Sequence, residues 1–293
     1  MYKKFQLKNG LKVLLIQSSK SPVVSVQMWV KTGSADERRV EAGVSHFIEH
    51  LLFKGTRKYG VGEIAAAVEG SGGMINAYTS LDETVFYVTL SKDFLETGFD
   101  IISEMMGFPL FDPDEVDRER EVVIEEIKRG QDNPHRQANR LLFSTLYRKH
   151  PYKEPVIGYE NVIRKISVRK IKEYFNTHYV PSNMTLLVVG DFQGPIKKQI
   201  EKYFLKISKR TKKLPSRVKE PVITRPRVKV KKSSFKDSLL NMAWPTPKAQ
   251  HKDIPVREVL SVLLGQGASS RLMKAQKKKK PLANYSSAYL MVT

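Results

Sequence analysis

Residues 43–53 read Gly-Val-Ser-His-Phe-Ile-Glu-His-Leu-Leu-Phe. A helix built on this stretch is apolar almost all round, which predicts a buried helix rather than a surface helix. His46 and His50 are one turn apart on that helix and therefore share a face. A buried histidine pair beside a carboxylate, here Glu49, has to be hydrogen-bonded, ion-paired or bound to a metal. We therefore expect this helix to lie at the centre of the core and to carry a polar site.

The order His-x-x-Glu-His within residues 46–50 is typical of one class of zinc peptidases. The two imidazoles can bind one ion from adjacent turns, and Glu49 is placed to take a proton from a water on that ion. A surface helix with two solvated histidines is the plain alternative for these five residues considered alone. The apolar surroundings of the motif favour the metal site.

The composition limits the classes of protein to consider. With 293 residues, 41% hydrophobic and 28% charged, the chain can form one large globular domain or two ordinary ones. It has no long apolar run, and its first residues lack the apolar region of a signal peptide, so we expect no transmembrane segment and a cytoplasmic location. Cysteine is absent, which excludes disulfides and thiolate ligands. Any metal is therefore expected to be held by nitrogen and oxygen.

The net charge of +21 is unevenly distributed. Residues 201–240 contain fourteen Lys or Arg against three acidic residues, about half of the whole excess. Prolines interrupt this stretch, and aromatic side chains that could stack on nucleotides are sparse in it. We therefore expect a solvated basic linker and no nucleic-acid partner, with a basic nucleic-acid-binding protein as the remote alternative.

Short apolar runs rich in β-branched residues predict four strands in the first third of the chain. Residues 11–16 and 23–30 are joined by a short connection, which predicts an antiparallel pair. Residues 74–79 and 84–90 flank a turn and predict a second pair. The glycine-rich residues 70–73 form a plain tight turn or allow a peptide backbone to approach a sheet edge. Periodic segments predict further helices, at residues 61–69, 93–106 and 113–130.

The third ligand of a catalytic zinc site is expected on another element, because such sites use three protein ligands and keep one position open. The helix predicted at residues 113–130 carries several glutamates. At about 100° per residue, Glu119 and Glu126 lie together on the flank of its apolar stripe. Glu121 and Glu125 fall on the solvent side, where surface ion pairs account for them. The helix geometry leaves Glu119 and Glu126 as candidates.

Five stretches of the chain resemble the pitrilysin family of zinc peptidases, peptidase family M16. They are residues 43–56 (GVSHFIEHLLFKGT), 72–88 (GGMINAYTSLDETVFYV), 119–128 (EREVVIEEIK), 150–157 (HPYKEPVI) and 179–192 (YVPSNMTLLVVGDF). The shorter bacterial processing-protease-like members are the most similar. The resemblance implies an α+β fold of the LuxS and mitochondrial processing peptidase metallohydrolase type, with helices packed on a largely antiparallel sheet.

Residue by residue, the resemblance implies one zinc ion bound by His46, His50 and Glu126. Glu126 is the last residue of an E-R-x-x-V-x-x-E pattern that the family shares. Glu49 is implied to activate the zinc-bound water. Glu119, the first residue of the pattern, is implied to be a further acid of the catalytic site. The helix-face argument and the resemblance thus favour the same two acids.

The resemblance also divides the chain into domains. Residues 1–212 resemble the zinc-binding N-terminal domain of the family. Residues 213–293 are expected to begin a second domain of the same kind, with residues 239–245 as its opening strand and residues 256–272 as its first helix and loop. Less than half of such a domain is present before the last residue, so we expect a fragment of a longer protein or the product of a truncated gene.

Substrate binding in the family uses an edge strand of the first domain and side chains of the second. The resemblance assigns Asn76 and Ala77 to that edge strand. Active relatives have an arginine in the second domain, followed seven positions later by a tyrosine. Here Lys277 occupies the position of the arginine, and the tyrosine is displaced by one residue to Tyr285. The expected contribution of the second domain is therefore altered.

We expect a zinc-dependent metalloendopeptidase that hydrolyses extended peptides or unfolded segments, with the water activated by Glu49. The alternative is a catalytically weak or inactive subunit of the same family, which acts in assembly or with an active partner. A homodimer or a related partner subunit is compatible with either function.

Overall fold

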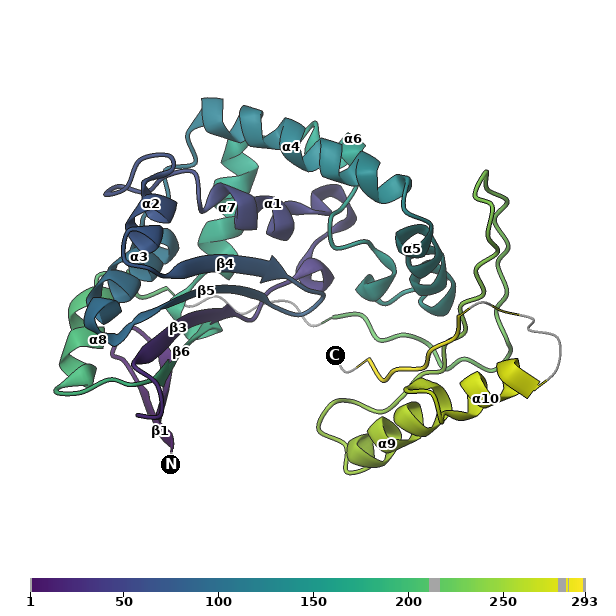
Figure 1. Cartoon of the computed structure of the whole chain (residues 1–293). Helices are drawn as coiled ribbons and strands as arrows, with labels where there is room; N and C mark the ends of the chain where they lie inside the picture. Colours follow the sequence, from purple (N-terminus) through teal and green to yellow (C-terminus); the bar gives the residue numbers. More distant parts are fainter. Residues whose placement is uncertain (1, 211–216, 279–282, 284, 292–293) are drawn as a thin grey trace. The chain divides into compact units, whose positions relative to one another are not determined.

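The computed structural model describes residues 2–210, 217–278, 283 and 285–291. The chain forms two compact units, Met1–Asn241 and Met242–Thr293, and each is described by itself (Figure 1). The predicted domain boundary between residues 212 and 213 lies outside the described residues. It therefore stays a prediction.

A six-stranded sheet in the order β1-β2-β6-β3-β5-β4 forms one layer of the first unit (Figure 1). The strands are β1 (Tyr2–Gln6), β2 (Lys12–Gln17), β3 (Val23–Val30), β4 (Met74–Thr79), β5 (Thr84–Ser91) and β6 (Met184–Gly190). Neighbouring strands are antiparallel except β2 and β6, which run parallel. The predicted α+β fold with a largely antiparallel sheet is thereby confirmed.

The predicted pairing of residues 11–16 with residues 23–30 is wrong, because β6 lies between β2 and β3. Leu186 of β6 pairs with Val13 on one side and with Met28 on the other. A short connection allows two strands to run in opposite directions, but it does not make them neighbours. The continuous apolar run of β6 favours a central position, where both of its edges are hydrogen-bonded. The predicted hairpin of β4 and β5 is confirmed.

Helices cover the apolar face of the sheet (Figure 1). Alternate residues of β3 point toward them, and Val24, Val26 and Met28 are fully buried. The α-helices of the first unit are α1 (Val44–Leu51), α2 (Glu63–Glu69), α3 (Leu95–Gly107), α4 (Pro113–Gln131), α5 (Pro134–Leu146), α6 (Glu160–Ile163), α7 (Val168–His178) and α8 (Ile196–Phe204). Single 3-10 turns are η1 (Ser34–Asp36), η2 (Arg39–Glu41), η3 (Lys92–Phe94), η4 (Pro151–Lys153) and η5 (Pro181–Asn183). Helix α1 packs against α4, α7 and the strands β4 and β5, so it is enclosed as its sequence predicts.

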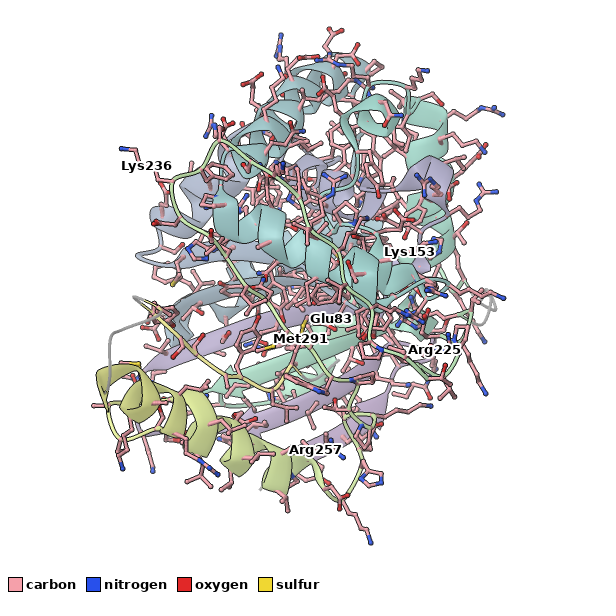
Figure 2. All side chains as sticks on the ribbon, turned by 90° about the vertical axis from the view of Figure 1, so that its right-hand side faces the viewer. Glu83, Lys153, Arg225, Lys236, Arg257 and Met291 are labelled. Carbon is pink, nitrogen blue, oxygen red and sulfur yellow. The ribbon has the colours of Figure 1, made fainter. Side chains whose placement is uncertain are left out.

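The basic segment 217–241 forms no helix or strand, and all of its residues are described. Most of its side chains are exposed, and those of Arg225 and Lys236 extend into the solvent (Figure 2). This agrees with a solvated basic linker.

The beginning of this segment is nevertheless bound firmly to the first unit. Arg217 donates to both carboxylate oxygens of Asp36, at 2.8 and 3.0 Å, and also to Asp82. The carboxylate of Glu220 accepts hydrogen bonds from three consecutive backbone N–H groups, those of residues 148–150, at 2.8–3.0 Å. These contacts hold the first residues of the segment against the rest of the first unit.

The second unit contains α9 (Ile254–Gly265) and α10 (Arg271–Lys278), which pack against each other. The strand predicted at residues 239–245 is wrong: these residues, all described, form none. A strand requires a hydrogen-bonded partner, and the described part of the second unit offers no strand to pair with. None of the helices in the described part of the chain is long and apolar enough to cross a membrane.

Candidate metal centre

The position of α1 is fixed at its N-terminus. Gly43 precedes the helix with φ +97°, and a Cβ atom there would lie 2.6 Å from the carbonyl oxygen of Ile157. The carboxylate of Glu37 accepts hydrogen bonds from the backbone N–H groups of Gly43 and Ser45, at 2.6 and 2.7 Å. Burial raises the pKa of Glu37 to about 8, although these two hydrogen bonds oppose the shift. In either protonation state the side chain satisfies N–H groups that the start of the helix leaves free. Because Phe47 is fully buried, the helix cannot rotate without disrupting the core.

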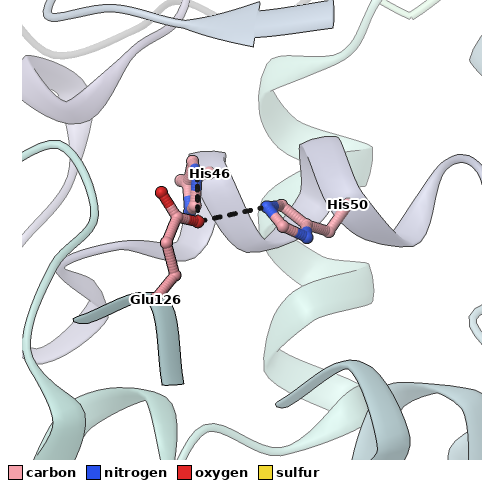
Figure 3. Close-up of side chains that lie close together, drawn as sticks. All are labelled: His46, His50 and Glu126. Atoms are coloured by element: carbon pink, nitrogen blue, oxygen red, sulfur yellow. Dashed lines mark ion pairs between the residues drawn. The ribbon is translucent and has the colours of Figure 1, made fainter. Parts of the chain in front are cut away.

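His46, His50 and Glu126 come together between α1 and α4 (Figure 3). One oxygen of Glu126 lies 3.5 Å from His46 Nε2 and 3.7 Å from His50 Nε2, and one ligand atom from each residue lies within 4.8 Å of the other two. Ligand atoms about 2.1 Å from a tetrahedral zinc ion are about 3.4 Å apart. Two imidazoles and one carboxylate at these separations fit a zinc ion and leave its fourth position open.

Glu119 orients the second histidine. Its Oε1 lies 2.9 Å from His50 Nδ1, and its Oε2 lies 2.7 Å from Lys54 Nζ. An ionised Glu119 accepts the Nδ1–H, which leaves the lone pair of Nε2 free for a metal. Among the described residues, Nδ1 of His46 is buried without such a partner. Of the two histidines, it is therefore His50 whose ring orientation and tautomer are fixed by a hydrogen bond from Nδ1.

The protonation states of His46 and Glu119 also fit metal binding. Burial lowers the pKa of His46 to about 3, and the neighbouring His50 and Arg136 act in the same direction. A neutral imidazole is the form that binds metals. Burial alone would lower the pKa of His50, but the hydrogen bond and charge of Glu119 outweigh it and raise that pKa. Burial likewise favours the neutral form of Glu119, yet the hydrogen bonds from His50 and Lys54 bring its pKa below the usual value. Glu119 is thus held as an anion.

Glu49 points toward strand β4 from α1. Its Oε2 accepts a hydrogen bond from the hydroxyl of Thr79, the last residue of β4. Burial raises the pKa of Glu49, and the hydrogen bonds from Thr79 oppose this shift. A carboxylate with a raised pKa is a stronger base than one in water. Glu49 is therefore suited to accept a proton beside the three candidate ligands.

A cavity of about 250 Å³ gives access to this region, lined by Glu49, His50, Phe53, Lys54 and Glu119. A second cavity, of about 320 Å³, lies where α4, α5 and α6 meet and includes none of the predicted site residues. The smaller cavity is the chemically relevant one, because it contains the candidate base and a candidate metal ligand.

The predicted substrate residues lie on an open sheet edge. Among the strands of the described residues, only β5 pairs with β4. Asn76 and Ala77 lie in the middle of β4, and the side-chain oxygen of Asn76 accepts the backbone N–H of Ala77 at 2.8 Å. Tyr285 lies in the second unit, where its side chain is 73% exposed, and Lys277 lies in α10. The assignment of Asn76, Ala77 and Tyr285 to substrate binding stays a prediction.

The sequence reasoning missed two residues that touch the candidate site, Lys54 and Thr79. Lys54 follows His46 and His50 at the same spacing of four, so continuing the helix face would have found it. Thr79 is two residues after Ala77 in a strand and shares its face. Its contact with Glu49 joins two elements that are distant in sequence, and a local pattern does not reveal such a contact.

The fold and the donor set define a protein of the zinc metallopeptidase class. Residues 12–160 match the family described as Insulinase (Peptidase family M16). Residues 165–293 match the family described as Peptidase M16 inactive domain. The chain belongs to peptidase family M16.

Several relatives are similar over almost the whole chain. YmxG of Bacillus subtilis, an uncharacterized zinc protease, is 28% identical to this chain. The matched region covers 99% of this chain and 71% of YmxG. The zinc protease PqqE of Helicobacter pylori is 32% identical to this chain. The matched region covers 97% of this chain and 66% of PqqE. A crystal structure of a protease from Helicobacter pylori superposes with a TM-score of 0.89 at 30% identity, over 99% of this chain and 71% of the other. The chain thus spans 66–71% of the length of these relatives.

Proposed function

We propose that this chain is a zinc-dependent metalloendopeptidase that cleaves extended peptides or unfolded segments. The observation that carries the proposal is the convergence of His46, His50 and Glu126 at zinc-compatible separations, with Glu49 beside them. The names of the relatives support zinc as the metal, and two imidazoles with one carboxylate are a ligand set that catalytic zinc sites use.

The three ligands would hold one zinc ion, which supplies Lewis acidity toward the peptide carbonyl and makes a water easier to deprotonate. Glu49 then serves as the general base. It accepts a proton from the attacking water while the water oxygen bonds to the carbonyl carbon. It donates that proton to the leaving amine nitrogen as the carbon–nitrogen bond breaks. Glu119 keeps His50 in the tautomer with its proton on Nδ1, so that the lone pair of Nε2 is free to bind the metal.

The open edge of β4 supports an extended substrate. A peptide added beside Asn76 and Ala77 would bind through main-chain hydrogen bonds, which depend little on side-chain identity. Folded proteins offer few free strands, so unfolded segments and peptides are the proposed substrates. The substrate would have to displace the Asn76 side chain from the N–H of Ala77.

The Glu49→Gln variant tests this mechanism, because it keeps the shape of the side chain but removes the base. We expect unchanged zinc content and a loss of cleavage of a quenched fluorescent peptide library by at least about 100-fold. Glu125→Gln, on the exposed side of α4, is the matched control and should cleave like the wild type. Chelation should abolish cleavage, and added zinc should restore it. Cleavage by Glu49→Gln at the wild-type rate would contradict the mechanism.

A second candidate function is that of a weakly active or inactive subunit that works with a partner, such as a second copy or a related chain. The altered positions in the second domain, Lys277 in place of the arginine and the displaced Tyr285, favour it. This function predicts that the wild-type chain binds zinc but cleaves no peptide by itself. The same zinc and cleavage measurements separate the two functions.

A further inference from the structure

Thr79 connects the strand at the open edge of the sheet with the proposed base. Residues Ile75, Ala77 and Thr79 alternate with the more exposed residues of β4 and are half-buried. The Thr79 hydroxyl donates to Glu49 Oε2 at 2.5 Å. A β-branched side chain has few χ1 conformations, so this donor is held in a narrow range of positions.

The backbone around Thr79 is fixed from two sides. Thr79 pairs with Thr84 across the β4–β5 hairpin, and the Thr84 hydroxyl donates to the carbonyl oxygen of Thr32 at 2.9 Å. The turn that follows Thr79 accepts hydrogen bonds from the backbone N–H groups of Ser34 and Ala35, at 3.1 and 2.9 Å. These contacts hold the backbone of Thr79 in place, and a residue can position a neighbouring side chain only if it is itself held in place.

We propose that Thr79 is a positioning residue for Glu49: its hydroxyl fixes the orientation of the carboxylate and ties it to the position of the β4 edge. The inference rests on the proposed function, in which Glu49 is the general base. The hydroxyl binds Oε2, so the plane of the carboxylate is set before a substrate arrives. A peptide that pairs with β4 therefore meets a base whose orientation is defined by the same strand.

The alternative role for Thr79 is packing between β4 and α1. Two variants separate the roles. Thr79→Val keeps the volume and removes the donor, whereas Thr79→Ser keeps the donor and removes a methyl group. A packing role predicts that serine is the more harmful change, and a positioning role predicts that valine is. Thr185→Val, the same change on β6, controls for the general effect of replacing a strand threonine.

Steady-state kinetics on the full chain provide the first readout. For Thr79→Val we expect a roughly 10- to 100-fold lower kcat, because small displacements of a catalytic group have effects of this size. KM and zinc content should stay near the wild-type values. Thr79→Ser and Thr185→Val should keep most of the activity. A Thr79→Ser variant that loses as much activity as Thr79→Val would overturn the proposal.

Crystal structures of the zinc-loaded Thr79 variants provide a second readout that does not depend on turnover. We expect the Glu49 carboxylate to be rotated or to occupy several conformations in Thr79→Val, and to keep one conformation in Thr79→Ser. An unchanged Glu49 in Thr79→Val would overturn the proposal. If the wild-type chain binds zinc but cleaves nothing, the proposed peptidase function fails, while these structures still decide the role of Thr79.

Discussion

At the residue scale, a single carboxylate, that of Glu119, contacts both His50 and Lys54. Glu119 is 6% exposed, and a buried anion is tolerated only when its oxygens are paired. Lys54 pairs with one oxygen, which leaves the other to accept the Nδ1–H of His50. The charge of Glu119 thereby defines which nitrogen of His50 is available to a metal.

Replacing Glu119 with glutamine tests this dependence. The amide has no charge to hold His50 in one tautomer, so zinc affinity should fall by about 10- to 100-fold. Competition with a chromophoric chelator measures the affinity. Glu121→Gln, an exposed change on the same helix, should bind zinc like the wild type. Wild-type affinity in Glu119→Gln would show that His50 is oriented by something else.

At the scale of elements, the N-terminus of α1 depends on a close backbone contact with the loop before α6. Gly158 has φ +76°, and a Cβ atom there would lie 2.2 Å from the carbonyl oxygen of Ala42. The loop and the start of α1 can approach this closely only because Gly158 has no side chain. The helix that carries two candidate ligands is thus positioned partly by a glycine more than a hundred residues away in the sequence.

Gly158→Ala should therefore destabilise the protein strongly, by about 3 kcal/mol or more, because a left-handed backbone and a steric clash act together. Gly62→Ala is the matched control, since Gly62 also has positive φ, +82°, but no atom lies within 4 Å of the added Cβ. Gly62→Ala should lower the free energy of unfolding by only about 1 kcal/mol. Urea unfolding measures both changes. Equal costs would show that the contact with Ala42 relaxes freely.

Helices and candidate ligand positions were predictable from the sequence where one segment contains the whole pattern. The periodicity of α4 placed Glu119 and Glu126 on one flank, and the structure places both beside α1. The position of β6 was not predictable, because strand order depends on segments far apart in sequence. The contact of Thr79 with Glu49 was missed for the same reason.

At the scale of the whole molecule, the linker segment is attached to the first unit through charge. Partial burial would raise the pKa of Glu220, but three backbone N–H groups and Arg227 outweigh it and lower the pKa to about 2. The folded pKa lies below the ordinary value of 4.5. The ionised carboxylate therefore stabilises the attachment above about pH 4.5, and this contribution is lost as the pH falls through about 2.

Glu220→Gln should release this attachment at neutral pH. The backbone N–H groups of residues 148–150 should then exchange with deuterium faster than in the wild type, because their acceptor loses its charge. Glu201→Gln, which removes a charge from the surface of α8, should leave their exchange unchanged. Identical exchange in Glu220→Gln and the wild type would show that the carboxylate does not hold the linker.

The central place of β6 has a consequence for the order of folding. β6 joins β2 to β3, yet it follows every candidate zinc ligand in the sequence. On a ribosome the His46, His50 and Glu126 segments emerge first, while the β1–β2 hairpin and the β3–β5–β4 group remain separate pieces with open edges. The nascent chain therefore carries all three candidate zinc ligands before it has a complete sheet, and residues 184–190 complete that sheet.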